Sequence, residues 1–218
     1  MSAYFVTGTD TGVGKTFVSC GLLHRFAREG NTTVGMKPIA AGVDASGLNE
    51  DVVRLRAAST VTADLDLVNP YSFASPVAPH LAAAEAGREI LFAPIVQALE
   101  KLRRQAEVVI VEGVGGFRVP LGPDGDSADL AQKLALPVIL VVGLRLGCLN
   151  HTLLTVEAIQ SRELSLAGWV ANSIDPAMLR RDHNIATLRK LIAAPLLGLV
   201  DFQARPDVAS AAAFLRAP

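Results

Sequence analysis

The feature that most constrains this chain is a turn near its N-terminus, Gly8-Thr9-Asp10-Thr11-Gly12-Val13-Gly14-Lys15-Thr16. The turn follows the apolar run Tyr4-Phe5-Val6 and precedes an amphipathic segment over 17–26. A strand, a glycine-containing turn, Gly-Lys-Thr and a helix form the context of a phosphate-binding loop, whose backbone N–H groups cradle phosphate oxygens. In such a loop Lys15 contacts the outer phosphates, and the Thr16 hydroxyl is a ligand for Mg²⁺.

The spacing of this turn departs from the standard phosphate loop. The standard pattern has its first glycine at position 9, where this chain has Thr9, and Gly8 lies one residue too early. Only Gly12 and Gly14 therefore lie inside the turn. A structural turn without a ligand is the alternative, but Gly-Lys-Thr between a strand and a helix rarely occurs by accident.

Composition limits the class of protein. Of the 218 residues, 50% are hydrophobic and 19% are charged, so we expect one globular domain over 1–218. The formal net charge of −1 provides no basic surface for nucleic acid or a membrane. Cys20 and Cys148 lack metal-ligand spacing and favour free thiols in a reducing compartment. With neither a signal peptide nor an apolar run of membrane-spanning length, the chain is expected to be cytoplasmic.

Short apolar runs alternate with amphipathic segments along the whole chain. They predict strands over 4–7, 33–37, 108–112, 137–143, 166–172 and 196–200, and helices over 16–28, 49–58, 92–105, 127–134, 150–160 and 178–192. The runs at 108 and 137 are continuous rather than alternating, which indicates burial on both faces of a parallel sheet. We therefore predict a doubly wound, mostly parallel α/β fold with ligands at the carboxyl ends of the strands. A long surface connection over 59–79 and a terminal helix over 208–215 complete the prediction.

Three charged residues lie where predicted strands end or helices begin. Lys37 could neutralise transferred charge beside a phosphate site, or could be an exposed strand-end lysine. Glu112 ends an apolar strand, the position at which nucleotide hydrolases hold Mg²⁺, and glycines follow it. Asp51 is, taken alone, explained by capping and by the helix dipole.

The segment Leu149-Asn150-His151 follows the strand predicted over 137–143. Asn150 could cap the next helix and leave N–H groups free for an anion. His151 could be a general base, although a solvated or capping histidine is the commoner outcome. No Ser/His/Asp or Cys/His set is evident, so the sequence predicts no protein nucleophile.

Seven pieces of sequence carry a family resemblance when they are taken together. They are Phe5-Val6-Thr7-Gly8-Thr9-Asp10-Thr11 with Val13-Gly14-Lys15-Thr16; Lys37-Pro38-Ile39-Ala40; Val68-Asn69-Pro70-Tyr71 with Pro79-His80; Val111-Glu112-Gly113 with Gly115-Gly116; Leu144-Arg145-Leu146-Gly147-Cys148-Leu149-Asn150-His151; Gly168-Trp169-Val170-Ala171-Asn172; and Ala194-Pro195-Leu196-Leu197-Gly198. In order and spacing they resemble the dethiobiotin synthetases, ATP-dependent enzymes of biotin synthesis, nearly from end to end. The one-residue expansion of that family's phosphate loop accounts for Thr9.

The resemblance implies a P-loop NTPase fold and a reaction of ATP, CO₂ and 7,8-diaminononanoate. One amine adds CO₂ to form a carbamate, and the carbamate oxygen attacks the γ-phosphate to give a carbamic–phosphoric anhydride. The second amine closes the ureido ring and expels phosphate, so the products are dethiobiotin, ADP and phosphate. The resemblance also implies a homodimer in which the start of the 150–160 helix binds the carboxylate of the partner's substrate.

The resemblance also assigns site residues. It implies catalytic roles for Lys37, Lys15 and Thr11, Mg²⁺ ligation by Thr16, Asp51 and Glu112, and substrate binding by Thr11, Lys37, Ala41, Leu149 and Asn150. Nucleotide contacts fall to Gly12, Val13, Gly14, Lys15, Thr16, Phe17, Asp51, Glu112, Gly113, Gly115 and Asn172, with Asn172 reading adenine. The family often has Ser where this chain has Ala41, which offers the substrate no side-chain hydroxyl at this position.

Two other classes of function are alternatives. A nucleotide-switched ATPase of the partitioning type carries a signature lysine five residues before the loop lysine, where this chain has Asp10. A metabolite kinase usually adds an arginine-rich lid, and the pairs Arg103-Arg104 and Arg180-Arg181 do not resemble one. Both observations favour the synthetase.

Overall fold

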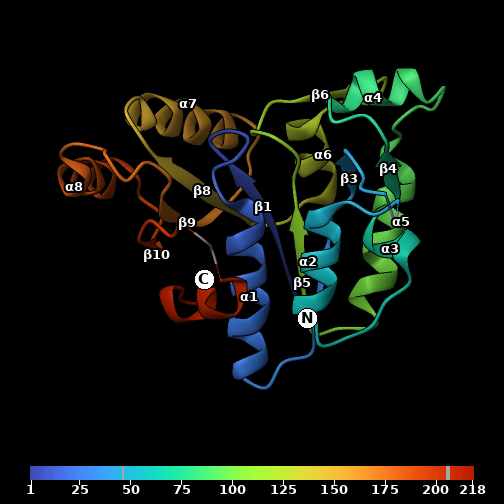
Figure 1. Ribbon diagram of the computed structural model, residues 1–218, viewed down its shortest axis with the longest axis horizontal. Coiled ribbons are helices and arrows are strands. Elements are labelled where there is room, and N and C mark those ends of the chain that lie inside the picture. Colours follow the sequence, from blue (N-terminus) through green and yellow to red (C-terminus); the bar gives the residue numbers. More distant parts are fainter. Residues whose placement is uncertain (46, 205–206) are drawn as a thin grey trace.

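A six-stranded parallel sheet forms the centre of the computed structural model, which describes residues 1–45, 47–204 and 207–218 (Figure 1). The strands run in the order β10-β9-β8-β1-β5-β2. Their bounds are β1 (Ser2–Gly8), β2 (Thr33–Met36), β5 (Val108–Glu112), β8 (Val138–Leu144), β9 (Leu166–Ser173) and β10 (Leu196–Val200). All six correspond to predicted strands, and the doubly wound α/β fold is confirmed.

Helices cover both faces of this sheet. On one face, α1 (Lys15–Arg28), α2 (Glu50–Ala58) and the C-terminal 3-10 helix η1 (Val208–Phe214) share a hydrophobic cluster with the strands. On the other face lie α5 (Phe92–Arg103), α6 (Ser127–Leu134) and α7 (Cys148–Ser161), with α8 (Arg181–Leu191) packed beside α7. Every residue of β5 and β8 is buried, which explains their uninterrupted apolar sequences.

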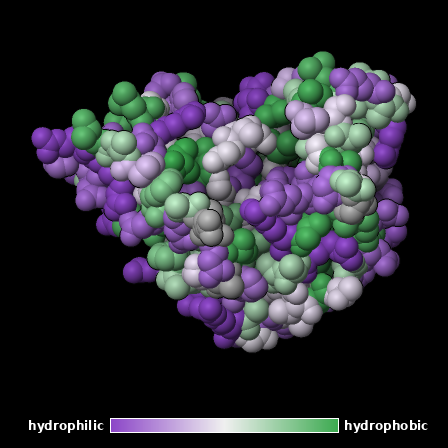
Figure 2. Space-filling model, in the orientation of Figure 1, coloured by the Kyte–Doolittle hydropathy of each residue, from purple (hydrophilic) through white to green (hydrophobic). Residues whose placement is uncertain are grey.

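The position of β1 determines where a ligand can bind. β1 pairs in parallel with β5 on one side and with β8 on the other. The chain places β2 and β5 on one side of β1 and then β8, β9 and β10 on the other side. The carboxyl end of β1 therefore lies at the switch point of the sheet. The turn after β1 therefore opens into the crevice of the fold, and in Figure 2 the upper edge of the molecule dips between α7 and α4 (Pro79–Glu85).

The prediction that residues 59–79 form a surface connection without regular structure was wrong. This stretch contains α3 (Leu65–Val68) and β4 (Tyr71–Phe73), and β4 pairs with β3 (Ile39–Ala41). Val68, Tyr71 and Phe73 are buried. The amide of Asn69 donates to the carbonyls of Lys37 at 2.6 Å and Tyr71 at 3.1 Å, which satisfies backbone groups that burial removes from water. A second small sheet, β6 (Pro120–Gly122) with β7 (Gly125–Asp126), was not predicted.

Two predicted boundaries moved for identifiable reasons. β2 ends at Met36, because Pro38 cannot donate a ladder hydrogen bond. α7 begins at Cys148 and its N-cap is Gly147 with φ 94°, so the prediction that Asn150 caps this helix was wrong. The predicted terminal helix is present as a 3-10 helix, and Ala211 and Leu215 pack where Gly21 of α1 leaves room. Among the described residues, no helix is long and apolar enough to cross a membrane.

Candidate active site

The phosphate-binding turn lies between β1 and α1, as the sequence predicts. Gly12 and Gly14 have φ of 74° and 91°, a backbone conformation that side chains other than glycine rarely adopt. Gly14 is the N-cap of α1 and makes no side-chain capping bond, so the first N–H groups of the helix are available to an anion. The Lys15 ammonium lies back over the turn and donates to the Asp10 carbonyl oxygen at 3.0 Å.

Four polar side chains meet beside this turn, three from α1, α2 and β5 and one from the connection after β2. The Thr16 hydroxyl lies 2.7 Å from Asp51 Oδ1 and 2.8 Å from Glu112 Oε1. Lys37 donates to Glu112 Oε1 at 2.5 Å, to Asp51 Oδ2 at 3.1 Å and to the Gly113 carbonyl at 3.2 Å. The structure thus brings together the predicted residues from α1, α2, the end of β5 and the residue after β2, which we call the lysine–carboxylate cluster.

Burial makes the charges of this cluster interdependent. Glu112 has 0% of its surface exposed and Lys37 has 4%. Burial alone would lower the pKa of Lys37, but the charges of Glu112 and Asp51 outweigh burial and raise it. For Asp51, burial alone would raise the pKa of the carboxyl group. The positive charge of Lys37 and the hydrogen bond from Thr16 outweigh burial and lower this pKa. Burial, followed by the positive charge of Lys37, lowers the pKa of Lys15 to about 8.

The cluster has the donor chemistry of a magnesium site. Glu112 Oε2 is buried and has no hydrogen-bond partner among the described residues. Together with Asp51 and the Thr16 hydroxyl it offers the hard oxygen ligands that Mg²⁺ prefers. Within the part of the chain that the structure describes, no group of three or more His, Cys, Asp or Glu side chains converges. A magnesium ion here would therefore complete its shell with water and phosphate oxygens.

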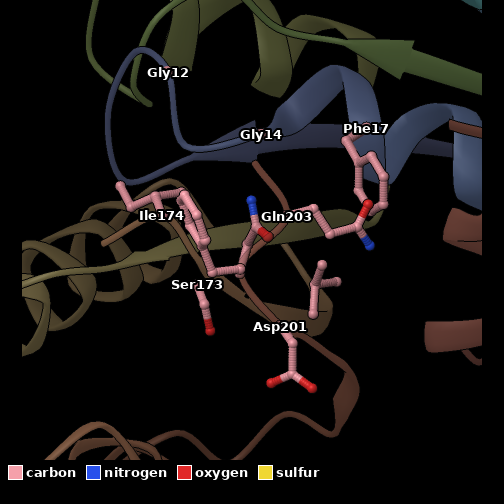
Figure 3. A pocket seen from close by; sticks show the side chains of 10 residues that line it. Gly12, Gly14, Phe17, Ser173, Ile174, Asp201 and Gln203 are labelled. Carbon is pink, nitrogen blue, oxygen red and sulfur yellow. The ribbon is translucent and has the colours of Figure 1, made fainter. Parts of the chain in front are cut away.

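A pocket of about 240 Å³ adjoins the phosphate-binding turn (Figure 3). Its lining is Gly12, Gly14, Phe17, Asn172, Ser173, Ile174, Val200, Asp201, Phe202 and Gln203. Asn172 donates from Nδ2 to the Val13 carbonyl at 2.8 Å, so this amide also braces the turn. A pocket with apolar walls and polar edges, one step from a phosphate site, has the size and chemistry to receive a nucleotide base.

The remaining predicted residues lie at different distances from this centre. Gly113 contributes its carbonyl to Lys37, and a side chain at Gly115 would lie 3.6 Å from the Thr11 hydroxyl. Thr11 is exposed, and Ala41 is partly buried at the end of β3. Leu149, Asn150 and His151 occupy the first turn of α7, and no hydrogen bond among the described residues joins them to the lysine–carboxylate cluster. The prediction for Leu149 and Asn150 requires a second copy of the chain.

Sequence reasoning missed several contributors to the site. Ser173 and Ile174 line the pocket at the end of β9, and the segment from Val200 to Gln203 lines it at the end of β10 and beyond. The ends of the predicted strands could have indicated both positions. Arg145 forms an ion pair with Asp10 of the phosphate-binding turn at 2.5 Å. No local signal marks that pair, because its partners are 135 residues apart.

The fold and the site define a class of protein. A parallel sheet whose central strand ends in a glycine-containing turn, Gly-Lys-Thr and a helix is that of a P-loop nucleoside triphosphatase. MinD, a cell division protein of Aquifex aeolicus, shares the fold with a TM-score of 0.59 at 15% identity, covering 99% of this chain and 88% of MinD. The cobyrinic acid a,c-diamide synthase of Mycobacterium smegmatis, with bound ADP and magnesium, has a TM-score of 0.54 at 18% identity and coverages of 97% and 90%.

Sequence comparison narrows this class to one family. A family model described as an AAA domain matches residues 2–208. The ATP-dependent dethiobiotin synthetase BioD of Aromatoleum aromaticum is 61% identical over 99% of this chain and 97% of its own length. That of Ralstonia nicotianae is 53% identical over 95% and 92%. The chain belongs to the dethiobiotin synthetase family, as its sequence motifs indicated.

Proposed function

We propose that this protein is an ATP- and Mg²⁺-dependent dethiobiotin synthetase that carboxylates 7,8-diaminononanoate with CO₂ and closes the ureido ring. The lysine–carboxylate cluster carries the proposal, because it places a buried ammonium and two carboxylates beside a phosphate-binding turn in a member of this family. Carbamate formation, phosphoryl transfer and ring closure all pass through anionic states. The site offers charge and position for these steps and needs no protein nucleophile.

The phosphate-binding turn and α1 hold the nucleotide in this proposal. The N–H groups from Thr11 to Thr16 and the Lys15 ammonium bind the phosphates, so Lys15 exchanges the Asp10 carbonyl for a phosphate oxygen. Thr16, Asp51 and Glu112 are the residues that would hold Mg²⁺, and the bound ion would supply positive charge against the charge that develops on the transferred phosphoryl group. The base enters the pocket beside Phe17, where Asn172 recognises adenine.

Lys37 stabilises the carbamate and the transferring phosphoryl group. Glu112 and Asp51 keep Lys37 protonated and aimed at the edge of the phosphate site. An ammonium fixed by two carboxylates needs little rearrangement when charge develops nearby, which favours the transition state. The Gly113 carbonyl accepts a hydrogen bond from Lys37, and Gly115 lies close to the Thr11 hydroxyl. Ala41 has no hydroxyl to offer the substrate.

The substrate carries a carboxylate at the far end of a long chain, and we assign that group to a second subunit. The first turn of α7 has a glycine N-cap with no side-chain bond, so N–H groups near Leu149 and Asn150 are available to an anion. Leu146, Leu153 and Leu154, at and beyond this helix start, are exposed by 95%, 37% and 57%. Exposed leucines beside an anion site fit a homodimer that forms its active site at the interface. The two buried free cysteines fit a cytoplasmic location, where thiols stay reduced.

A turnover assay tests the proposal. ADP release should require 7,8-diaminononanoate and bicarbonate together, with dethiobiotin identified by mass. A metabolite kinase would release ADP without bicarbonate, and a nucleotide-switched ATPase would need neither. Lys15→Ala should reduce turnover by about 10²–10³ and weaken nucleotide binding, because it removes a charge placed at the transferred phosphoryl group. Turnover within a few-fold of wild type would remove the phosphate-loop assignment.

A further inference from the structure

The base pocket is bounded by the carboxyl ends of β9 and β10 and by the residues that directly follow these strands. β9 and β10 pair in parallel up to Asn172 and Val200, the last register pair of that ladder. Ser173 and Ile174 then line one wall of the pocket, and the segment from Asp201 to Gln203 lines the other. Among the described residues, no backbone hydrogen bond joins these two walls beyond that register pair. Ser173 is still paired with Leu144 of β8, so it is the position of the segment from Asp201 to Gln203 against Ser173 that depends on side chains.

Arg181, the first residue of α8, bridges the two walls. Its Nη1 donates to the Ser173 hydroxyl at 3.2 Å and to Asp201 Oδ1 at 2.6 Å, while its Nε donates to Asp182 at 3.1 Å. In Figure 3 the Ser173 hydroxyl and the Asp201 carboxylate both point away from Gly12 and Gly14. These two polar groups therefore act as acceptors for Arg181. Their contribution to the pocket is to hold its two walls in position.

The energetics indicate a local role for this bridge. The Asp201 side chain is 74% exposed and that of Arg181 is 34% exposed, and ion pairs of this kind add little to global stability. A planar guanidinium with several donors can hold both acceptors at once, whereas a lysine ammonium lacks this fixed fork. The contacts are therefore suited to setting local geometry.

We propose that Arg181 is a positioning residue for nucleotide-base recognition: by joining Ser173 to Asp201 it fixes the width of the base pocket. This inference rests on the nucleotide site proposed above. Arg181 touches neither the phosphate-binding turn nor the lysine–carboxylate cluster through any hydrogen bond among the described residues. Its loss should therefore weaken ligands that carry a base and leave base-free phosphates unaffected.

Calorimetric titration with two probes tests this role. Mg-ADP carries a base, and Mg-tripolyphosphate carries phosphates alone. Arg181→Gln should weaken Mg-ADP about three- to tenfold, the net effect of losing about one hydrogen bond, and leave Mg-tripolyphosphate unchanged. In turnover, the KM for ATP should rise by the same factor at constant kcat. Arg181→Lys should lie between the wild type and Arg181→Gln.

Asp182→Asn is the matched control, because it alters the other partner of Arg181 outside the pocket and should bind Mg-ADP as the wild type does. Asp201→Asn should mimic Arg181→Gln, and the double variant should add little, since both changes remove one bridge. Asp201→Asn also tests the bridge if Arg181→Gln fails to fold.

Equal weakening of both probes, unchanged Mg-ADP binding, or additive losses in the double variant would overturn the role of Arg181. A wild-type protein that binds Mg-ADP no more tightly than Mg-tripolyphosphate would overturn the base pocket itself. The turnover assay with diaminononanoate and bicarbonate judges the proposed function separately, so the two failures are distinguishable.

Discussion

Lys37 is the residue whose environment differs most from what its sequence position suggests. A lysine after a short strand is usually exposed, but this one is buried between two carboxylates and the Gly113 carbonyl. A buried ammonium with three acceptors keeps its charge, because the carboxylates offset the cost of removing it from water. Such a charge is held ready for an anion that forms during the reaction.

Lys37→Gln should act on kcat rather than on nucleotide binding. We expect kcat to fall about 10²–10³-fold, the cost of removing one preorganised charge from a developing anion, with the KM for ATP changed by less than about threefold. Steady-state kinetics checks this, and circular dichroism establishes that the variant is folded. A raised KM with normal kcat would make Lys37 a ground-state binder instead.

Asp51 and Glu112 should reveal the metal site through the magnesium dependence of turnover. Asp51→Asn and Glu112→Gln should each raise the Mg²⁺ concentration for half-activity by at least about tenfold, since an amide is a weaker ligand than a carboxylate. Glu50→Gln, at the adjacent exposed position of α2, is the matched control. An unchanged magnesium dependence in both variants would leave Asp51 as an acid in the first turn of α2, where Asn49 is the cap, and Glu112 as a structural ion pair with Lys37.

Individual residues were predictable where local sequence carries the signal. Lys15 and Thr16 follow from the motif, and Glu112 follows from a carboxylate at the end of an apolar strand. Lys37 could not be assigned from its position, because its burial depends on Asp51 and Glu112, which are 14 and 75 residues away in sequence. The sequence position of Asp51 predicts an acid at the start of a helix, and Asp51 does lie in the first turn of α2. The fold adds a second role, because Asp51 also accepts hydrogen bonds from Thr16 and Lys37.

At the level of elements, the turn after β1 is tied to the turn after β8. The Thr9 N–H donates to the Val141 carbonyl within β8 at 3.0 Å, and Arg145, in the turn after β8, pairs with Asp10 at 2.5 Å. Asp10 Oδ1 also accepts from the Thr11 N–H at 2.7 Å, so the same carboxylate braces the phosphate-binding turn and the start of α7. Asp10 thus stands at the position of the signature lysine of the nucleotide-switched ATPases, but here it forms an ion pair with Arg145 and a hydrogen bond with the Thr11 N–H.

Arg145→Gln and Asp10→Asn should loosen the phosphate-binding turn slightly. Both side chains are almost half exposed, and exposed ion pairs contribute about 0.2–1 kcal/mol, so the KM for ATP should rise about two- to fivefold. Arg162→Gln, which breaks the ion pair to Asp129 beyond the other end of α7, is the matched control and should leave the KM unchanged. An equal effect of all three variants would indicate general destabilisation instead.

The elements of the central sheet were predictable because burial on both faces leaves a continuous apolar signature in β5 and β8. The small sheets were not, since β3, β4, β6 and β7 have two or three residues each and too short a pattern to register. The start of α7 was misplaced because Gly147 provides the cap through backbone conformation. Only the fold shows which glycine adopts a positive φ.

At the scale of the whole molecule, the described chain holds the nucleotide half of the proposed site more completely than the substrate half. The lysine–carboxylate cluster and the base pocket come from one subunit, whereas α7 presents its open first turn and exposed leucines outward. A substrate with reactive amines at one end and a carboxylate at the other can join these two features across an interface. The dimer would then be required for substrate binding.

Mixing two inactive variants tests this shared site. Lys15→Ala removes the phosphate contact of its own site, and Asn150→Leu alters the helix start that serves the partner's site. In a heterodimer, one site keeps both wild-type contributions and the other loses both. Equal random mixing gives half heterodimers with one good site each, so about a quarter of wild-type activity should return. Lys15→Ala mixed with Lys37→Gln is the control, because both residues belong to the nucleotide half and every site stays defective. Subunit exchange is first verified with tagged chains, and each variant is shown to be inactive alone. If exchange then restores no activity, the start of α7 serves its own subunit or binds no substrate.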